Sequence, residues 1–189
     1  MPSTLHGHVP SLTAGRGWAK FSVCFSYARE LHAKRGAFHI ANAEGRTLTI
    51  RHASQDDLQA MHKISEAGHI GWSIQQLQAE LDLDFSTVLV SDSEADIEGF
   101  ICGWHVCEEL QVMALAVSQG RRREGIGRAL LEELLCHGRR LGGLSAFLEF
   151  RASNEAALQL YIGAGFTQVG WRDAYYENGE AAILMSRIL

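Results

Sequence analysis

The chain has 189 residues, 47% of them hydrophobic, which is enough for one full core but too few for two ordinary domains. Its 17 Lys and Arg against 22 Asp and Glu leave a formal net charge of -5, so no global positive field would hold a nucleic-acid backbone. The 4 cysteines include no CxxC pair and the 9 histidines no HExxH motif, which disfavours a metal site and a disulfide framework. We therefore expect a cytoplasmic protein without a metal.

The first 45 residues differ in composition from the rest, because they are basic and poor in acidic side chains. Their best apolar run, residues 21–28, is flanked by Lys20 and Arg29 and is too short to span a bilayer. We expect residues 1–45 to be a flexible or loosely helical extension and residues 46–189 to form a single domain. The composition of the extension also resembles an organelle transit peptide, which stays an alternative.

The first part of the predicted domain consists of one strand, two helices and three further strands. Residues 47–52 alternate apolar and polar side chains, as in a half-buried strand, and Ser54 with Asp57 three residues later is typical of a helix start. Ser73 marks the start of a second short helix. Successive apolar runs then predict strands joined by hairpins, at residues 87–90, 97–106 and 110–117.

The second part of the domain begins with a long helix. Its leucines recur with a helical period after Gly125, and the Gly142-Gly143 pair ends it. The elements predicted after it are a strand at residues 144–151, a helix from Ser153 to about Gly163, and strands near residues 166–171 and 181–188. The sum is a mixed α+β fold with one strand–helix–strand crossover in its middle.

Arginine and glycine dominate the segment before the long helix, which reads Arg122-Arg123-Glu124-Gly125-Ile126-Gly127-Arg128. Helix N-termini present free N–H groups and a partial positive charge, and glycines allow a pyrophosphate to approach those amides. The segment therefore indicates an anion site. On spacing alone, a tight turn followed by a solvated arginine loop explains it equally well. An ATP site is least favoured, because the loop lacks a Gly-Lys-Ser/Thr ending.

Two motifs resemble a known family. The loop motif Arg122-x-x-Gly125-x-Gly127, placed after a strand, resembles the acetyl-CoA pyrophosphate loop of the GNAT superfamily of N-acetyltransferases. A downstream motif resembles the bacterial ribosomal-protein-alanine N-acetyltransferases of that superfamily, and reads Leu148-Glu149-Phe150-Arg151-Ala152-Ser153-Asn154, then Tyr161 and Gly165-Phe166. The resemblance covers about residues 46–189. It implies the GNAT acyl-CoA N-acyltransferase fold, a mixed sheet in which the fourth and fifth strands are parallel but splayed.

The resemblance also implies acetyl-CoA as cosubstrate. The pantetheine arm would enter between the splayed strands and pair with backbone groups of the fourth strand, while the loop amides hold the pyrophosphate. Asn154 would offer its amide to the arm; the alternative is a surface residue at the start of the helix. The implied cofactor-binding residues are Leu115, Ala116, Val117, Arg123, Glu124, Gly125, Ile126, Gly127, Arg128 and Asn154.

The implied catalytic residues are Glu149 as general base and Tyr161 as the acid that protonates the CoA thiolate. A free protein α-amine has a pKa of about 7.7 to 8.0 against about 10.4 for lysine, so a carboxylate acting through a water suits an N-terminal amine better. Glu149 could instead lie on the solvent face of its strand, and Tyr161 could be a core aromatic that packs with Leu158. No cysteine lies in the motif, which favours direct attack in a ternary complex.

The substrate that the resemblance implies is the N-terminus of a ribosomal protein, with an alanine of the small subunit as the leading candidate. Glu109 and either Tyr175 or Tyr176 could line the peptide entrance. The alternatives are a lysine or small-molecule amine as the acceptor, and a non-catalytic acetyl-CoA-binding module. The chain departs from the family pattern at Gly71, Ala174 and Ala181, in elements that frame the peptide, so these departures concern the substrate more than the cofactor.

Overall fold

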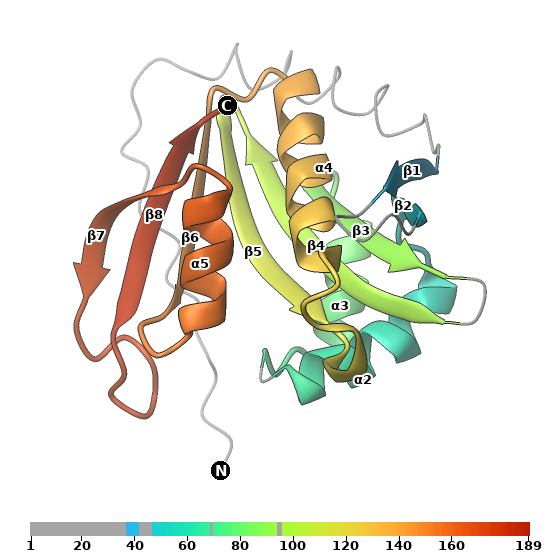
Figure 1. The fold of residues 1–189 in the computed structure, drawn as a ribbon, viewed down its shortest axis with the longest axis horizontal. Coiled ribbons are helices and arrows are strands. Elements are labelled where there is room, and N and C mark those ends of the chain that lie inside the picture. Colours follow the sequence, from blue (N-terminus) through green and yellow to red (C-terminus); the bar gives the residue numbers. More distant parts are fainter. Residues whose placement is uncertain (1–36, 42–46, 69, 94–95) are drawn as a thin grey trace.

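The computed structural model describes residues 37–41, 47–68, 70–93 and 96–189. These residues form an 8-stranded sheet with the strand order β1-β2-β3-β4-β5-β6-β8-β7 (Figure 1). The strands are β1 Phe38–Ala41, β2 Thr47–His52, β3 Ser86–Asp92, β4 Ile97–Val106, β5 Glu109–Val117, β6 Ser145–Arg151, β7 Thr167–Arg172 and β8 Ala182–Ile188. The helices are α2 Leu58–Ala67, α3 Ile74–Asp82, α4 Ile126–Arg140 and α5 Glu155–Gly163. In the described part of the chain, no helix is long and apolar enough to cross a membrane.

Helices cover both faces of the sheet. In Figure 1, α4 and α5 lie on the near face, and their core includes Leu130 and Leu134 of α4 and Tyr161 of α5. On the opposite face, α2 and α3 form a second core around Met61 and Leu77. The sheet therefore separates an α4/α5 side from an α2/α3 side, and the side chains of each strand alternate between the two.

The predicted elements are confirmed, with differences at their ends. The helix expected after Ser54 begins with a 3-10 turn, Gln55–Asp57, before α2. Helix α5 is capped by Asn154 rather than Ser153, because Ser153 donates its N–H and hydroxyl to Glu180. The last two strands do not follow chain order, since β8 inserts between β6 and β7.

The predicted extension contains one element that the sequence did not predict. Strand β1 pairs antiparallel with β2, with Phe38 opposite Ile50, where a flexible or loosely helical segment was expected. Residues 1–36 and 42–45 of the extension lie outside the described residues.

The splayed pair of strands is confirmed and consists of β5 and β6. These two are the parallel neighbours in the sheet, but their register runs only from Glu109 opposite Ser145 to Val112 opposite Leu148. Beyond that point, residues 113–117 of β5 and 149–151 of β6 form no pairs with each other. The two strands thus share one closed end and leave an opening at the other.

A β-bulge in β5 lies where the opening begins. Cys102 of β4 pairs with Ala114 and Gly103 pairs with Val112, which leaves Met113 as the extra residue. A bulge bends its strand and reverses the side-chain alternation beyond it. Accordingly, Val112 belongs to the α4/α5 core, whereas Ala114 belongs to the α2/α3 core.

Candidate active site

The loop between β5 and α4 has the backbone shape of an anion site. Arg123 has φ 71° and Gly125 has φ 78°, and a left-handed conformation is unusual for a long side chain such as arginine. Alternation of right- and left-handed residues turns successive N–H groups into a concave nest that favours anions. No side chain caps the first turn of α4, so its amides stay available to a ligand.

Gly127 lies where this loop meets the opening in the sheet. A Cβ at this position would be 3.5 Å from Val117 Cγ2 of β5 and 3.7 Å from Leu160 Cδ2 of α5, which are ordinary contact distances. Packing within the described chain therefore does not require a glycine here. The bare backbone instead leaves room for a group from outside to reach the amide, at the boundary between β5 and α5.

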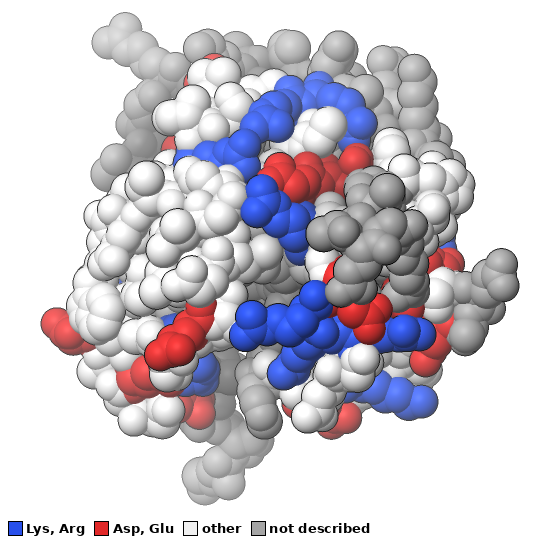
Figure 2. Space-filling view, in the orientation of Figure 1, with Lys and Arg blue, Asp and Glu red and all other residues white. Residues whose placement is uncertain are grey.

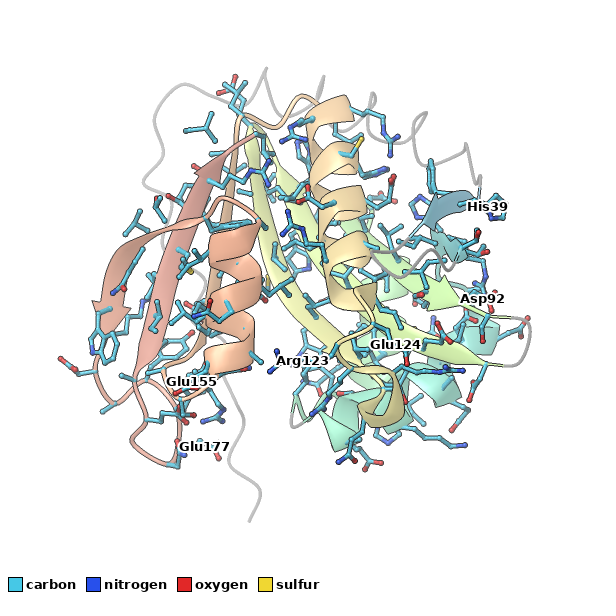
Figure 3. The ribbon with its side chains drawn as sticks, viewed as in Figure 1. His39, Asp92, Arg123, Glu124, Glu155 and Glu177 are labelled. Carbon is cyan, nitrogen blue, oxygen red and sulfur yellow. The ribbon has the colours of Figure 1, made fainter. Side chains whose placement is uncertain are left out.

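The arginines of the loop have different partners. Arg121 forms ion pairs with the buried Glu98 at 3.3 Å and with Glu124 at 3.7 Å, and Arg122 Nε donates to the carbonyl of Val117 at 3.3 Å. Arg123 has no ion pair or hydrogen bond with the described residues, and Figure 3 shows its side chain beside the gap between α4 and α5. Basic side chains gather on this face at the position of the loop (Figure 2). The loop is thus a positive region on a chain of net charge -5.

Glu149 is the first residue of β6 that has no partner on β5. Its neighbours Leu148 and Phe150 belong to the α4/α5 core, so Glu149 points to the other side of the sheet. Glu149 therefore alternates in direction with its neighbours, as the sequence suggested. Its side chain is nevertheless only 27% exposed, and its carboxylate accepts hydrogen bonds from two side chains. Arg172 Nη1 donates to Oε2 at 2.8 Å, and the Tyr175 hydroxyl donates to Oε1.

Tyr161 lies on the opposite side of β6 from Glu149. It is 7% exposed, with its ring centroid 5.3 Å from Phe150 and 5.9 Å from Phe166. Burial, and secondarily the nearby Tyr176, raises the pKa of its hydroxyl well above the usual value, so the group keeps its proton. The ring therefore packs in the core, and its aromatic neighbours are Phe150 and Phe166 rather than the Leu158 that the sequence suggested. Within the described chain the hydroxyl has no hydrogen-bond partner.

Asn154 uses one of its two polar atoms in the fold. Its side-chain oxygen accepts the Ala157 N–H at 3.1 Å as the cap of α5, which leaves the NH₂ group for a ligand.

Of the strand residues predicted to face the cofactor, Ala116 is buried, while Leu115 and Val117 lie on the α4/α5 side next to the opening. Glu109 does not join the group. It lies opposite Ser145, at the end where β5 and β6 are paired. Ser145 precedes Glu149 by four residues, which is roughly 13 Å along the strand at about 3.3 Å per residue.

The segment between β7 and β8 completes the surroundings of Glu149. In addition to Tyr175, which contacts Glu149, this segment contains Tyr176 and Glu180. The Arg151 guanidinium lies over the Tyr176 ring, with Cζ 3.9 Å from the ring centroid, and donates to Glu180 at 3.0 Å. The sequence pointed to the tyrosine pair but missed Arg172 and the anchoring role of Glu180. No group of three or more His, Cys, Asp or Glu suited to a metal ion occurs among the described residues.

Residues 53–166 match the acetyltransferase (GNAT) family. The chain belongs to this family. Among curated relatives, the [Ribosomal protein bS18]-alanine N-acetyltransferase of Escherichia coli K12 is 32% identical over 145 residues, covering 73% of this chain and 95% of the relative. An N-alpha-acetyltransferase of Saccharolobus solfataricus is 30% identical over 164 residues, covering 77% and 96%.

Solved structures agree with this assignment. The ribosomal-protein-S18-alanine N-acetyltransferase from Escherichia coli superposes with a TM-score of 0.69 at 30% identity, over 75% of this chain and 93% of the other. Ard1 from Thermoplasma volcanium gives a TM-score of 0.70 at 26% identity, over 75% and 97%. This GNAT chain is therefore an acetyltransferase, and the family's acetyl donor is acetyl-CoA.

Proposed function

We propose that this acetyltransferase modifies the N-terminal α-amine of a protein in the cytoplasm, with the alanine of a small-subunit ribosomal protein as the leading substrate. The observation that carries the proposal is the position of Glu149, a held carboxylate at the start of the opening between β5 and β6. The name of the Escherichia coli relative supports the choice of substrate. A lysine or small-molecule amine is the second candidate acceptor.

The residues around the opening fit acetyl-CoA. The nest from Arg123 to Arg128 would hold the pyrophosphate through its amides, and Gly127 allows the close approach that this requires. The free edge of β5 at Leu115, Ala116 and Val117 would hold the pantetheine arm as an added strand does. The NH₂ group of Asn154 would contact the same arm.

When bound, acetyl-CoA supplies the acetyl group as a thioester. Glu149 would accept a proton through a water as the neutral amine forms its bond to the carbonyl carbon. Tyr161 would donate its proton to the departing sulfur as the carbon–sulfur bond breaks. The two residues lie on opposite sides of β6, so the amine would come from the α2/α3 side and the thiol would leave on the α4/α5 side.

Neither strand that borders this opening carries a cysteine. Cys102 is buried, where its thiol donates to Glu80, Cys107 lies in the turn between β4 and β5, and Cys136 lies within α4. This arrangement supports direct transfer in a ternary complex rather than a covalent acetyl-enzyme.

The test combines substrate and variants. The protein is incubated with acetyl-CoA and a short peptide beginning Ala-Arg, and CoA release and peptide mass are followed. We expect one acetyl group on the α-amine, with kcat reduced roughly 100- to 10,000-fold in Glu149→Gln and strongly reduced in Tyr161→Phe. Glu155→Gln is the matched control, because Glu155 is an exposed carboxylate at the start of α5.

Two results would contradict the proposal. Acetylation of lysine peptides without α-amine acetylation would identify a sibling activity of the same family. Tight binding of acetyl-CoA with no acetyl transfer to either kind of peptide would favour a binding module.

A further inference from the structure

The carboxylate of Glu149 is paired with a cation in this structure. Arg172 lies on β7, two strands away from β6, and its side chain reaches across β8. Arg172 stands in one row of the sheet with Ala182 and Arg151, whereas Glu149 stands in the next row on the same side with Leu184 and Gly170, so the contact is diagonal. The sheet register therefore brings the half-exposed guanidinium within reach of the carboxylate.

The other charged and titratable groups near Glu149 are engaged elsewhere or neutral. On β6 itself, Arg151 is directed to Glu180 and to the Tyr176 ring. In the β7–β8 segment, the hydrogen bond to Glu149 raises the pKa of Tyr175, and burial raises the pKa of Tyr176, so both phenols keep their protons. Among the described residues, Arg172 is therefore the cation in direct contact with the carboxylate.

We propose that Arg172 is a positioning residue that sets the pH range in which the bound amine can react. The inference rests on the proposed function. A lone carboxylate beside the amine would stabilise the ammonium form, which cannot attack a thioester. With Arg172 in contact, the pair carries no net charge, so the amine can lose its proton at a lower pH.

The direction of the effect follows from the charges. Removing the guanidinium leaves a net negative charge beside the amine, which raises the pKa of the bound ammonium group. This change moves the acidic limb of the kcat profile to higher pH. The shift should be about one pH unit, the lower end of the range for charges within about 6 Å, because Arg172 is 50% exposed.

The experiment is the pH dependence of kcat for the wild type and for Arg172→Gln, with saturating acetyl-CoA and the Ala-Arg peptide. We expect the acidic limb to move up by about one unit, so that kcat below the limb falls about tenfold. KM for the peptide should not rise, because the protonated amine binds at least as well, and KM for acetyl-CoA should not change. A purely structural role would move the KM values or lower kcat equally at all pH.

Two further variants separate charge from shape. Arg172→Lys keeps the cation and should restore the wild-type limb, whereas Arg139→Gln removes an exposed charge at the end of α4 and should leave the profile unchanged. A wild-type limb in Arg172→Gln, or a shifted limb in Arg172→Lys, would overturn the inference while leaving the proposed function intact. Absence of α-amine acetylation by the wild type would instead remove the proposed function on which it rests.

Discussion

Glu180 anchors the β7–β8 segment through the start of α5. Its carboxylate accepts from the hydroxyl and the N–H of Ser153 and from Arg151, and these bonds lower its pKa from 4.5 to about 2. A carboxylate whose pKa is lower in the folded state stabilises the fold above its unfolded pKa, and this contribution is lost as pH falls through the folded pKa.

We therefore expect Glu180→Gln to destabilise the protein most above about pH 5, with the difference from the wild type shrinking between about pH 4.5 and 2. Urea denaturation at a series of pH values measures this difference. A difference that stays constant over that range would show that the carboxylate charge is not involved.

At the residue scale, the sequence identified side chains whose motif is continuous along the chain. Glu149, Asn154 and Tyr161 lie in one segment, and Glu149 is the first residue of β6 beyond the paired part. Arg172 was not identified, because its contact depends on β8 lying between β6 and β7. The helix was expected to begin at Ser153, but Asn154 is its cap, since Glu180 engages Ser153. The catalytic and binding roles of all these residues stay predictions.

At the element scale, a buried carboxylate ties α3 to the sheet. Glu80 Oε2 accepts from Ser86 Oγ at 2.7 Å on β3, and from Cys102 Sγ at 3.3 Å and Trp104 Nε1 at 2.7 Å on β4. These contacts hold α3 against β3 and β4. Among the described residues, Glu80 forms hydrogen bonds but no ion pair. The carboxylate also contributes to the raised pKa of the Cys102 thiol, after burial itself.

Because Glu80→Ala removes a charged acceptor that three donors share, two of them buried, we expect it to lower the free energy of unfolding by about 3 kcal/mol. Equilibrium urea denaturation gives the value. The control is Glu66→Gln, whose exposed carboxylate lies 3.7 Å from His62 and should contribute less than about 0.5 kcal/mol. Equal effects of the two changes would mean that the Glu80 network adds nothing to stability.

The order of elements was predictable, but the strand order and the bulge were not. Ser73 and Gly125 mark helix starts, because a cap and a left-handed turn each require particular residue types. The sequence around Met113 does not predict the bulge, because Met113 stands in an apolar run in which residues on both sides of the sheet are buried or half-buried. Periodicity cannot reveal a change of side when both sides are apolar.

At the scale of the whole molecule, the loop before α4 is positively charged although the chain as a whole is negative. The chain carries -5, but the loop before α4 presents Arg122 and Arg123 to the surface. Salt screens exposed charges within roughly 10 Å at 0.1 M. We expect KM for acetyl-CoA to rise several-fold between about 50 and 500 mM NaCl.

Steady-state kinetics at a series of NaCl concentrations test this expectation. Acetyl-pantetheine, which carries no phosphate, should show little salt dependence, and Arg123→Gln should weaken the dependence seen with acetyl-CoA. The same salt response with both donors would mean that the loop does not bind the phosphates.

The extra residue at Met113 has a consequence for how a large acceptor can be handled. Strands β5 and β6 stop pairing there, Glu149 points to the α2/α3 side, and helix α4, which follows the anion nest, packs on the other side of the sheet (Figure 1). In the proposed reaction, the acceptor protein and the cofactor would therefore approach from different sides of the sheet. A large acceptor bound on one side would then not block the path by which spent CoA leaves.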